Sequence, residues 1–572
     1  MKARFLLGSA IATSTLFSVF QLNAAPTVWT YPGCGTVTDT DFTYTTLVQA
    51  YKDPDQDLQE PDKMDFSMDA QGNVDIYFVE IRPGNIKRYS GATKKVKTLV
   101  KLPNWGNGSD YQTVHNQNQT EEGVTGIVLD PNFKTNHYIY VHWSPLPDTN
   151  QVFRISRFTV AGDTILMASE KVVLTIPGQR QTCCHTGGGM AFDGYGDLWI
   201  SMGANSGRSG NNNSNPPEGI NEDKKYESEE WGAASTYGLR GGIIRIHPDE
   251  SPKGYTIPKD NFGEFFAKKT GDNSYLDTSK VSPEIFIKGC RNPYTLSIDP
   301  VRRWVMWGDV GPDVLSGDVR EEDNLRKEPG FEGWPYFVGN NTSFSTPPGT
   351  SQTTTAPVNN SKWNKGLKVL PPARPTYHLH KFGSTPITGP LYRYDGDLNS
   401  TVKFPPHFDR HWFIADFSSN QVKVLTLSEN GDTVKAESPI FSNHDFNGIV
   451  DFKAGPDGAL YTVNYGNSNF TTGGNTRIEK ISYKGTCRLA APKLEQVTGS
   501  VIKTVSPYGQ KGFLANIGKG AAFFVQTGTK GFEAFDLTGK KVWSRTGLKT
   551  GDALHLPANL PQGALQFHWV PN

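Results

Sequence analysis

The 572-residue chain has no excess of charge of either sign. Lys plus Arg and Asp plus Glu both number 57, so no overall field attracts nucleic acid or an anionic membrane. Beyond the amino-terminal stretch, no uninterrupted apolar run is long enough to span a bilayer. The sequence therefore argues against a nucleic-acid-binding protein and against a membrane span.

Several nucleotide and hydrolase motifs are missing as well. The chain has no Gly-x-Ser-x-Gly elbow, no P-loop and no dinucleotide fingerprint between a strand and a helix. Nicotinamide chemistry is therefore disfavoured. There are only five cysteines, and their spacing matches no zinc pattern, which argues against a metal held by sulfur.

Residues 1–24 have the order of a secretory signal. Lys2 and Arg4 precede an apolar stretch, and small residues end at Ala25. We expect a mature protein that begins near Ala25 and is secreted, periplasmic or on the cell surface. That compartment allows disulfides, although an odd number of cysteines leaves at least one thiol unpaired.

The composition favours strands and tight turns, with 59 Gly, 38 Pro and 12% aromatic residues. One pattern recurs, in which Asp or Gly-Pro-Asp and a short polar turn precede an aromatic and β-branched strand. Its copies begin at Asp69, Asp130, Asp193, Asp299, Pro406 and Gly455. Six copies predict an all-β fold, a six-bladed β-propeller over residues 25–486.

A four-stranded blade needs ~40 to 50 residues, and most copies of the repeat are farther apart than that. We expect the additional residues in two polar loops, 205–237 and 339–371, which surround the entrance to the central channel, the mouth. The pattern stops near Tyr483, and 487–500 has the composition of a linker. Short alternating strands over 501–572 predict a small β-sandwich. Its Asp-Leu-x-Gly-Lys-x-Val-Trp segment resembles carboxy-terminal sorting domains, which engage export machinery. A carbohydrate-binding or structural module is the alternative.

His185 is the first candidate for chemistry. It stands in Cys-Cys-His-Thr-Gly-Gly-Gly, and three consecutive glycines let the backbone bend sharply and a flat ligand approach closely. An imidazole titrates near neutral pH and can accept a hydroxyl proton, so His185 is a candidate general base. A loop histidine bonded to backbone is the alternative.

Arg291 and Asn292 stand at an equivalent position in the next blade. The following proline keeps Asn292 extended, so that both side chains are aimed. Arg offers a rigid fork of donors for a carboxylate or for the oxygen of a reducible carbonyl. A third stretch, Gly308-Asp-Val-Gly-Pro-Asp, combines turn carbonyls with carboxylates, the oxygen-only surroundings that calcium prefers. A plain turn with an acidic run is the alternative there.

Together these stretches resemble the glucose/sorbosone dehydrogenase family, six-bladed propellers that bind pyrroloquinoline quinone (PQQ) with calcium. The resemblance covers about 62–483, most of the mature chain. It rests on segments that begin at Glu121, Cys184, Leu239, Gly289, Gly311 and Gly333. It implies a soluble dehydrogenase that oxidises an aldose and passes electrons to an acceptor that the sequence does not identify.

The resemblance also implies a role for each matching residue. His185 becomes the base that takes the sugar hydroxyl proton while hydride passes to the quinone. Cofactor-binding residues are Arg291, Asn292 and Glu121, of which Glu121 also stands beside the substrate. The carbonyls of Gly311 and Pro312 become calcium ligands.

The chain departs from the family pattern at several positions. Glu332 stands where an aromatic residue is common, and Cys290 replaces an apolar residue before the Arg-Asn turn. Lys381 and Arg393 are candidates, by position only, for the basic residues that close over the quinone. Two other functions remain open: a non-catalytic propeller that binds carbohydrate or protein, and a calcium-dependent lactonase.

Ring closure of the propeller predicts one disulfide. Cys34 lies just before the first blade and Cys487 just after the last, so closure can bring them within bonding distance. Cys183 and Cys184 are adjacent and can form a vicinal disulfide with each other. Cys290 would then be the unpaired thiol. Alternatively, all five are small buried hydrophobes.

Overall fold

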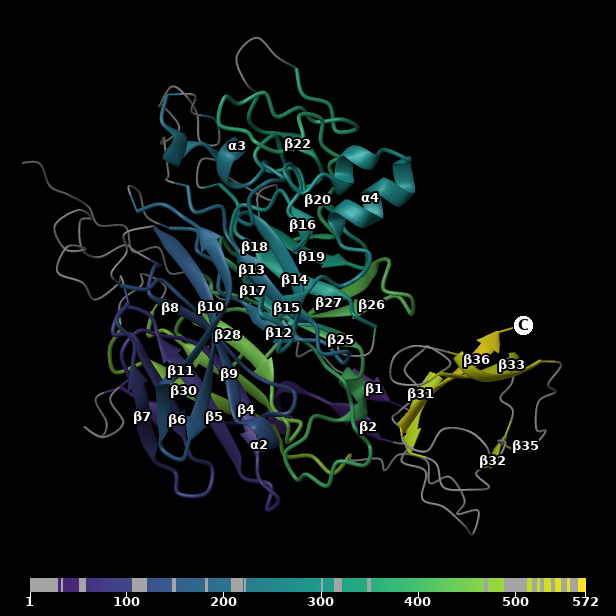
Figure 1. Cartoon of the computed structure of the whole chain (residues 1–572). Helices are drawn as coiled ribbons and strands as arrows, with labels where there is room; N and C mark the ends of the chain where they lie inside the picture. The colour runs from purple at the N-terminus through teal and green to yellow at the C-terminus, as the bar shows by residue number, and fades with distance from the viewer. Residues whose placement is uncertain are drawn as a thin grey trace, which may run out of the picture.

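Six sheets arranged in a ring make up most of the protein (Figure 1). The computed structural model describes the propeller over residues 29–31, 34–50, 58–104, 121–146, 151–180, 184–206, 220, 223–299, 302–312, 321–346, 351–467 and 472–487. It also describes the strands between residues 512 and 571. The predicted six-bladed propeller is confirmed.

Each of the first three blades contains four strands that pair antiparallel in chain order. The first is β4 (Pro61–Met68), β5 (Val74–Glu80), β6 (Asn85–Tyr89) and β7 (Val96–Lys101). The second is β8 (Val124–Leu129), β9 (Tyr138–Trp143), β10 (Val152–Ala161) and β11 (Thr164–Pro177). The third is β12 (Met190–Phe192), β13 (Leu198–Met202), β14 (Gly242–Pro248) and β16 (Ile285–Lys288), extended by β15 (Tyr255–Thr256) and β20 (Gly330–Phe331).

The remaining blades follow the same order, except that the last is completed from the amino terminus. The fourth is β17 (Pro293–Ile298), β18 (Val305–Asp309), β19 (Glu322–Arg326) and β23 (His378–Leu379). The fifth is β24 (Pro386–Leu391), β25 (His411–Asp416), β26 (Val422–Leu427) and β27 (Val434–Ile440). The sixth is β28 (Ile449–Ala454), β29 (Leu460–Asn464), β30 (Arg477–Tyr483) and β3 (Phe42–Gln49).

The first strands of the blades form the inner ring. β4, β8, β12, β17, β24 and β28 contact one another in this order, and β28 contacts β4 again. All six copies of the sequence repeat cover the turn into the second strand of a blade and that strand itself, from β5 to β29. The loops that precede the first strands therefore meet at one end of the channel, the mouth.

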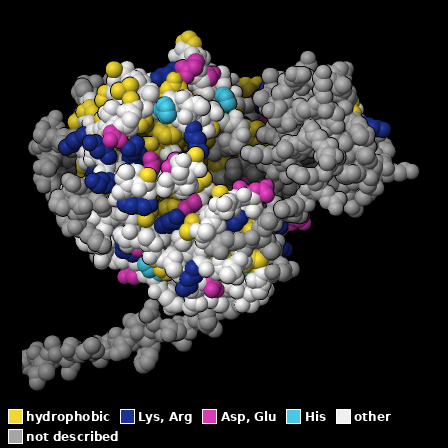
Figure 2. Space-filling view, turned by 90° about the horizontal axis from the view of Figure 1, so that it is seen from below, with side chains coloured by type: hydrophobic (Ala, Val, Ile, Leu, Met, Phe, Trp, Pro, Cys, Tyr) yellow, Lys and Arg dark blue, Asp and Glu magenta, His cyan; other side chains and the backbone are white. Residues whose placement is uncertain are grey.

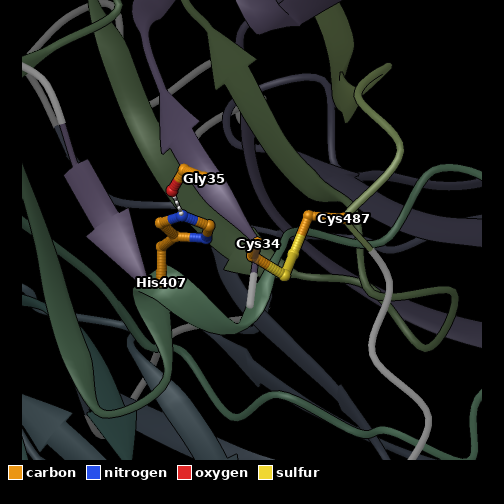
Figure 3. The surroundings of a disulfide bond; sticks show 4 residues. All are labelled: Cys34, Gly35, His407 and Cys487. Carbon is orange, nitrogen blue, oxygen red and sulfur yellow. Dashed lines mark hydrogen bonds between the residues drawn. A yellow bond between two sulfur atoms is a disulfide. The ribbon is translucent and has the colours of Figure 1, made fainter. Parts of the chain in front are cut away.

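The ring is closed in two ways at the seam between its ends. β3 pairs antiparallel with β30 from Phe42 opposite Tyr483 to Gln49 opposite Arg477. Beside this pairing, Cys34 and Cys487 form a disulfide with 5.2 Å between their Cα atoms (Figure 3). The predicted ring-closing disulfide is confirmed, and Cys290 is the free, buried thiol.

Two other predictions about cysteine and the chain ends fall where the structure describes little. Cys184 takes part in a disulfide, but Cys183 lies outside the described residues, so the vicinal bond stays a prediction. The signal segment 1–24 and the linker 487–500, apart from Cys487, also lie outside them.

Insertions gather above the mouth, where Figure 1 shows α3, α4 and β22 together. The loop predicted over 205–237 contains η4 (Lys225–Glu227) and α3 (Glu229–Gly232). The helix α4 (Phe262–Thr270) was not predicted from the sequence. The remaining short elements are β1 (Trp29–Tyr31), β2 (Gly35–Val37), η1 (Asp39–Asp41), α2 (Phe133–Asn136), η5 (Asn273–Leu276), β21 (Phe337–Val338), β22 (Thr342–Ser343) and η6 (Pro406–Phe408).

The carboxy-terminal strands form two antiparallel sheets, as a small β-sandwich requires. One sheet contains β31 (Gly512–Asn516), β36 (Ala564–Pro571), β33 (Thr529–Phe535) and β34 (Lys541–Thr546). The other pairs β32 (Ala522–Phe524) with β35 (Ala553–His555).

In the described part of the chain no helix is long and apolar enough to cross a membrane. Seen from below, basic and acidic side chains are interspersed (Figure 2).

Candidate active site

The loop before β12 holds His185 in a backbone conformation that side chains rarely adopt. Cys184 and His185 have φ of 89° and 58°, and Gly187 and Gly188 have 69° and 110°. A Cβ on Gly188 would lie 2.3 Å from the carbonyl oxygen of Thr125, so only glycine fits there. Left-handed non-glycine residues cost of order 1–3 kcal/mol each and persist where the surroundings hold them.

Two hydrogen bonds hold the His185 backbone in this conformation. Its N–H donates to Oε2 of Glu121 over 2.8 Å, and its carbonyl accepts from the N–H of Asn205 over 2.9 Å. Glu121 was predicted beside the substrate and cofactor. The structure places it in the mouth, where its carboxylate also accepts the N–H of Thr186 over 3.4 Å and so braces the loop.

The imidazole of His185 faces a carboxylate that the sequence did not single out. The residue is 3% exposed, and its Nδ1 lies 3.9 Å from Oε1 of Glu229 on α3. A carboxylate beside one ring nitrogen orients the imidazole and stabilises its protonated form. The arrangement therefore suits a general base that has to accept a proton and hold it.

The Arg291-Asn292 turn is fixed by the carboxylate of Asp309. The backbone N–H groups of Arg291 and Asn292 donate to the two oxygens of Asp309, over 3.2 and 2.7 Å. NH1 of Arg291 donates to the carbonyl of Val310 over 3.0 Å. The backbone of the turn is therefore fixed, and Oδ1 of Asn292 is buried without a hydrogen-bond partner.

The His185 loop and the Arg291-Asn292 turn meet across Gly203. A Cβ on Gly203 would lie 2.2 Å from the carbonyl oxygen of His185 and 2.9 Å from Oδ1 of Asn292. The carbonyl of Arg291 also accepts the N–H of Ala204 over 2.9 Å. Two stretches that are far apart in the sequence therefore share one site, as their equivalent blade positions predicted.

Gly311 and Pro312, the predicted calcium ligands, line a cleft beside Arg291. It is small, with a volume of about 10 Å³, close to what one water molecule needs. Its other lining residues are Gly289, Asp309, Glu322, Glu332, Trp334, Phe337 and Val338. Burial raises the pKa values of the Asp309 and Glu322 carboxyl groups, although backbone N–H donors act against this at Asp309. A cation at this cleft would favour their ionised forms.

Among the described residues, no group of three or more His, Cys, Asp or Glu side chains is placed to hold a metal ion. Side chains alone therefore do not form a metal site there. The residues that line the cleft carry backbone carbonyls and the carboxyl groups of Asp309, Glu322 and Glu332. Such a mixed set suits calcium rather than zinc. The calcium prediction therefore depends on the carbonyls of Gly311 and Pro312.

The two departures from the family pattern have structural explanations. Burial alone would raise the pKa of Glu332, but the guanidinium groups of Arg326 and Arg374 bring it below its usual value. Glu332 accepts from Nε of each arginine over 3.0 Å, which ties β20 to its neighbours. Burial raises the pKa of the Cys290 thiol well above its usual value, so this cysteine is a poor nucleophile.

Of the two basic residues proposed to close over the quinone, Arg393 is not at the mouth. Its Nε donates to Oδ1 of Asp299 over 3.1 Å. Asp299 follows β17, whereas Asn292 precedes the same strand, so the two mark opposite ends of the blade. Lys381 precedes β24 and lies at the mouth end, exposed.

Buried charge also lines the channel inside the ring. The hydroxyl of Tyr294 donates to Oδ1 of Asp62 over 2.6 Å, and Nζ of Lys63 lies 3.6 Å from the centroid of the Tyr294 ring. Burial raises the pKa of Asp62 to about 6, against the opposing effect of Lys63. These residues begin β4 and β17, and no sequence motif singled them out.

Comparisons with known proteins agree with this geometry. Residues 58–261 match the family model described as Glucose / Sorbosone dehydrogenase. Over those residues the propeller is similar to the glucose/sorbosone dehydrogenase family. Over 410 residues the chain is 22% identical to the aldose sugar dehydrogenase of Escherichia coli strain K12, covering 71% of this chain and 87% of that one.

A solved structure shows the same propeller fold. The apo form of the soluble aldose sugar dehydrogenase from Escherichia coli matches with a TM-score of 0.50 and 20% identity, over 77% of this chain and 99% of that one. The PQQ-bound aldose sugar dehydrogenase from Streptomyces coelicolor gives a TM-score of 0.48 and 16% identity, over 77% and 98%. The family model and the Escherichia coli relative are both described as sugar dehydrogenases, which supports sugar oxidation in general.

Proposed function

We propose that this protein is an exported, PQQ-dependent dehydrogenase that oxidises an aldose to the lactone. The observation that supports the proposal best is the meeting of His185 with the Arg291-Asn292 turn across Gly203, next to the cleft at Gly311. A general base, a fixed guanidinium and oxygen donors for a cation are the three requirements of such an oxidation.

The residues of the mouth fit the proposed cofactor. Oδ1 of Asn292 and Nε1 of Trp334 are buried polar atoms without a hydrogen-bond partner, and both belong to segments that border the cleft. The Arg291 guanidinium, 5.8 Å from the Trp334 ring centroid, supplies a charged donor for a carboxylate or carbonyl oxygen. Gly311 and Pro312 would hold calcium through their carbonyls.

The protein's own groups have distinct tasks in the proposed reaction. His185 takes the proton from the anomeric hydroxyl, and Glu229 stabilises the imidazolium that results. PQQ, when bound, would supply the two-electron oxidant that takes up the C1 hydrogen of the sugar as hydride. Arg291 and Asn292 would hold the cofactor and stabilise negative charge on it, and their burial would strengthen this interaction.

The proposal is tested by reconstitution. Purified protein is mixed with PQQ and calcium chloride, and the absorbance of the quinone is followed as aldoses are added, with a dye as electron acceptor. Reduction of the quinone and of the dye is expected with the parent protein. A protein that binds PQQ without turnover of any aldose, or that does not bind PQQ, would contradict the proposal and favour a non-catalytic binding propeller.

We extend the proposal to export and sorting. Lys2, Arg4 and the apolar stretch after them support cleavage near Ala25. The two carboxy-terminal sheets support a separate module that engages sorting machinery. Amino-terminal sequencing of the protein recovered from outside the cytoplasm tests the first point, and cell fractionation after deletion of residues 501–572 tests the second.

A further inference from the structure

Arg240, just before β14, is a buried cation without an ion-pair partner among the described residues. It is 3% exposed, and its guanidinium carbon lies 3.5 Å from the ring centroid of Trp231. Within the described part of the chain no carboxylate forms an ion pair with it, and its NH1 atom has no hydrogen-bond partner. A buried charge that is not fully paired and hydrogen-bonded is costly, and a ligand of opposite sign would offset that cost.

Other cations surround the same aromatic residues. Nζ of Lys225 lies 4.6 Å from the Trp231 ring centroid, and Nζ of Lys365 lies 5.7 Å from that of Tyr237. Burial, then the charges of Arg240 and Lys365, lower the pKa of Lys225. Like charges therefore face one another here. We call Lys225, Arg240 and Lys365, with Trp231 and Tyr237, the cationic rim.

The cationic rim adjoins the predicted base. Glu229, which lies 3.9 Å from His185, is the one described carboxylate whose charge acts appreciably on Arg240. Tyr237 is 46% exposed, Lys365 is exposed and Lys225 is half-buried, so a ligand can reach the rim from solvent. A molecule that extends from His185 past Glu229 would meet these groups first.

We propose that the cationic rim is a subsite for the carboxylate of an acidic sugar, so that the substrate is a uronic-acid-containing saccharide. The inference rests on the proposed function, because His185 marks where the reducing end is oxidised. Aromatic side chains offer flat faces for the apolar side of a sugar ring. Lys225 and Lys365 pair with the carboxylate of the sugar. The buried guanidinium of Arg240 attracts the same carboxylate from the protein interior, where the dielectric constant is low.

Binding to the protein without added cofactor tests the subsite apart from catalysis. Trigalacturonate and the neutral maltotriose are titrated into the full chain by calorimetry at two salt concentrations. We expect measurable binding of trigalacturonate only, weakened by salt. Loss of one exposed ion pair costs up to a few-fold in affinity, so Lys225→Gln and Lys365→Gln should each weaken binding about threefold and together about tenfold. Lys268→Gln, on α4 with its own partners Asp260 and Glu264, removes the same charge elsewhere and should have no effect.

Two further measurements separate the possible sources of the anion. PQQ affinity of the double variant should equal that of the parent; weaker PQQ binding with unchanged trigalacturonate binding would assign the rim to the cofactor and overturn the proposal. Arg240→Met should weaken trigalacturonate binding in a protein that still folds, since it removes a charge that attracts the carboxylate. A lower melting temperature with unchanged binding would show a structural role and also overturn the proposal. Equal binding of both trisaccharides would refute it even in an active enzyme.

Discussion

The ring-closing disulfide allows a prediction whose size follows from the structure. Cys34 and Cys487 are 453 residues apart, and in the chain-entropy model a crosslink over so long a loop stabilises the folded state by about 6 kcal/mol. This is an upper figure, because the unfolded chain retains structure and the folded bond is rarely free of strain. We therefore expect the replacement of both cysteines by alanine to cost about 3 kcal/mol.

The expected change in melting temperature is small because the propeller is large. Unfolding entropy near the melting point is about 2.1 cal/mol/K per residue, or roughly 0.9 kcal/mol/K for a domain of about 450 residues. A loss of about 3 kcal/mol then lowers the melting temperature by about 3 °C. The variant keeps the pairing of β3 with β30 at the seam, so it should still fold.

Scanning calorimetry of variants is the suitable assay, since a reductant would also act on the disulfide at Cys184. Cys34→Ala with Cys487→Ala is compared with the parent and with Cys290→Ala, which changes a buried free thiol. A double variant with the melting temperature of the parent would refute the argument from loop length. An equal decrease in Cys290→Ala would show that lost packing, rather than the crosslink, explains the change.

Three other predictions concern the site and the stability of the ring. His185→Ala should fold and lose about 100- to 10,000-fold in turnover of reconstituted protein; parental turnover at saturating PQQ would exclude His185 as the base. Arg291→Ala should weaken PQQ binding about 10- to 150-fold with little change in melting temperature, because a charge-assisted hydrogen bond is lost; an unchanged dissociation constant in fluorescence titration would count against this. Burial alone would lower the pKa of His380, but Asp323 and Asp416 raise it to about 10, so its stabilising contribution is complete below pH 6.5 and disappears as the pH approaches 10. The melting-temperature difference between the parent and His380→Gln should shrink over that interval, and a constant difference would contradict it.

The mouth combines rigid and variable parts of the fold. His185, Arg291 and Asn292 precede inner strands, so the ring fixes their relative positions. Glu229 and the cationic rim come from the insertions above the ring, which can change without disturbing the blades. The proposed chemistry therefore depends on the ring, and the proposed preference for acidic sugars depends on the insertions.

The sequence by itself determined the number of blades, the closure at Cys34 and Cys487, and the end of the channel at which His185 and Arg291 lie. These are consequences of a local repeat, because each turn-plus-strand copy has the same place in its blade. Only the tertiary structure decided that Glu229 faces His185, that Arg393 pairs with Asp299 away from the mouth, and that Arg240 is buried without an ion-pair partner in the described part of the chain. Those contacts join insertions or neighbouring blades, and the insertions have no period from which a position in space can be predicted.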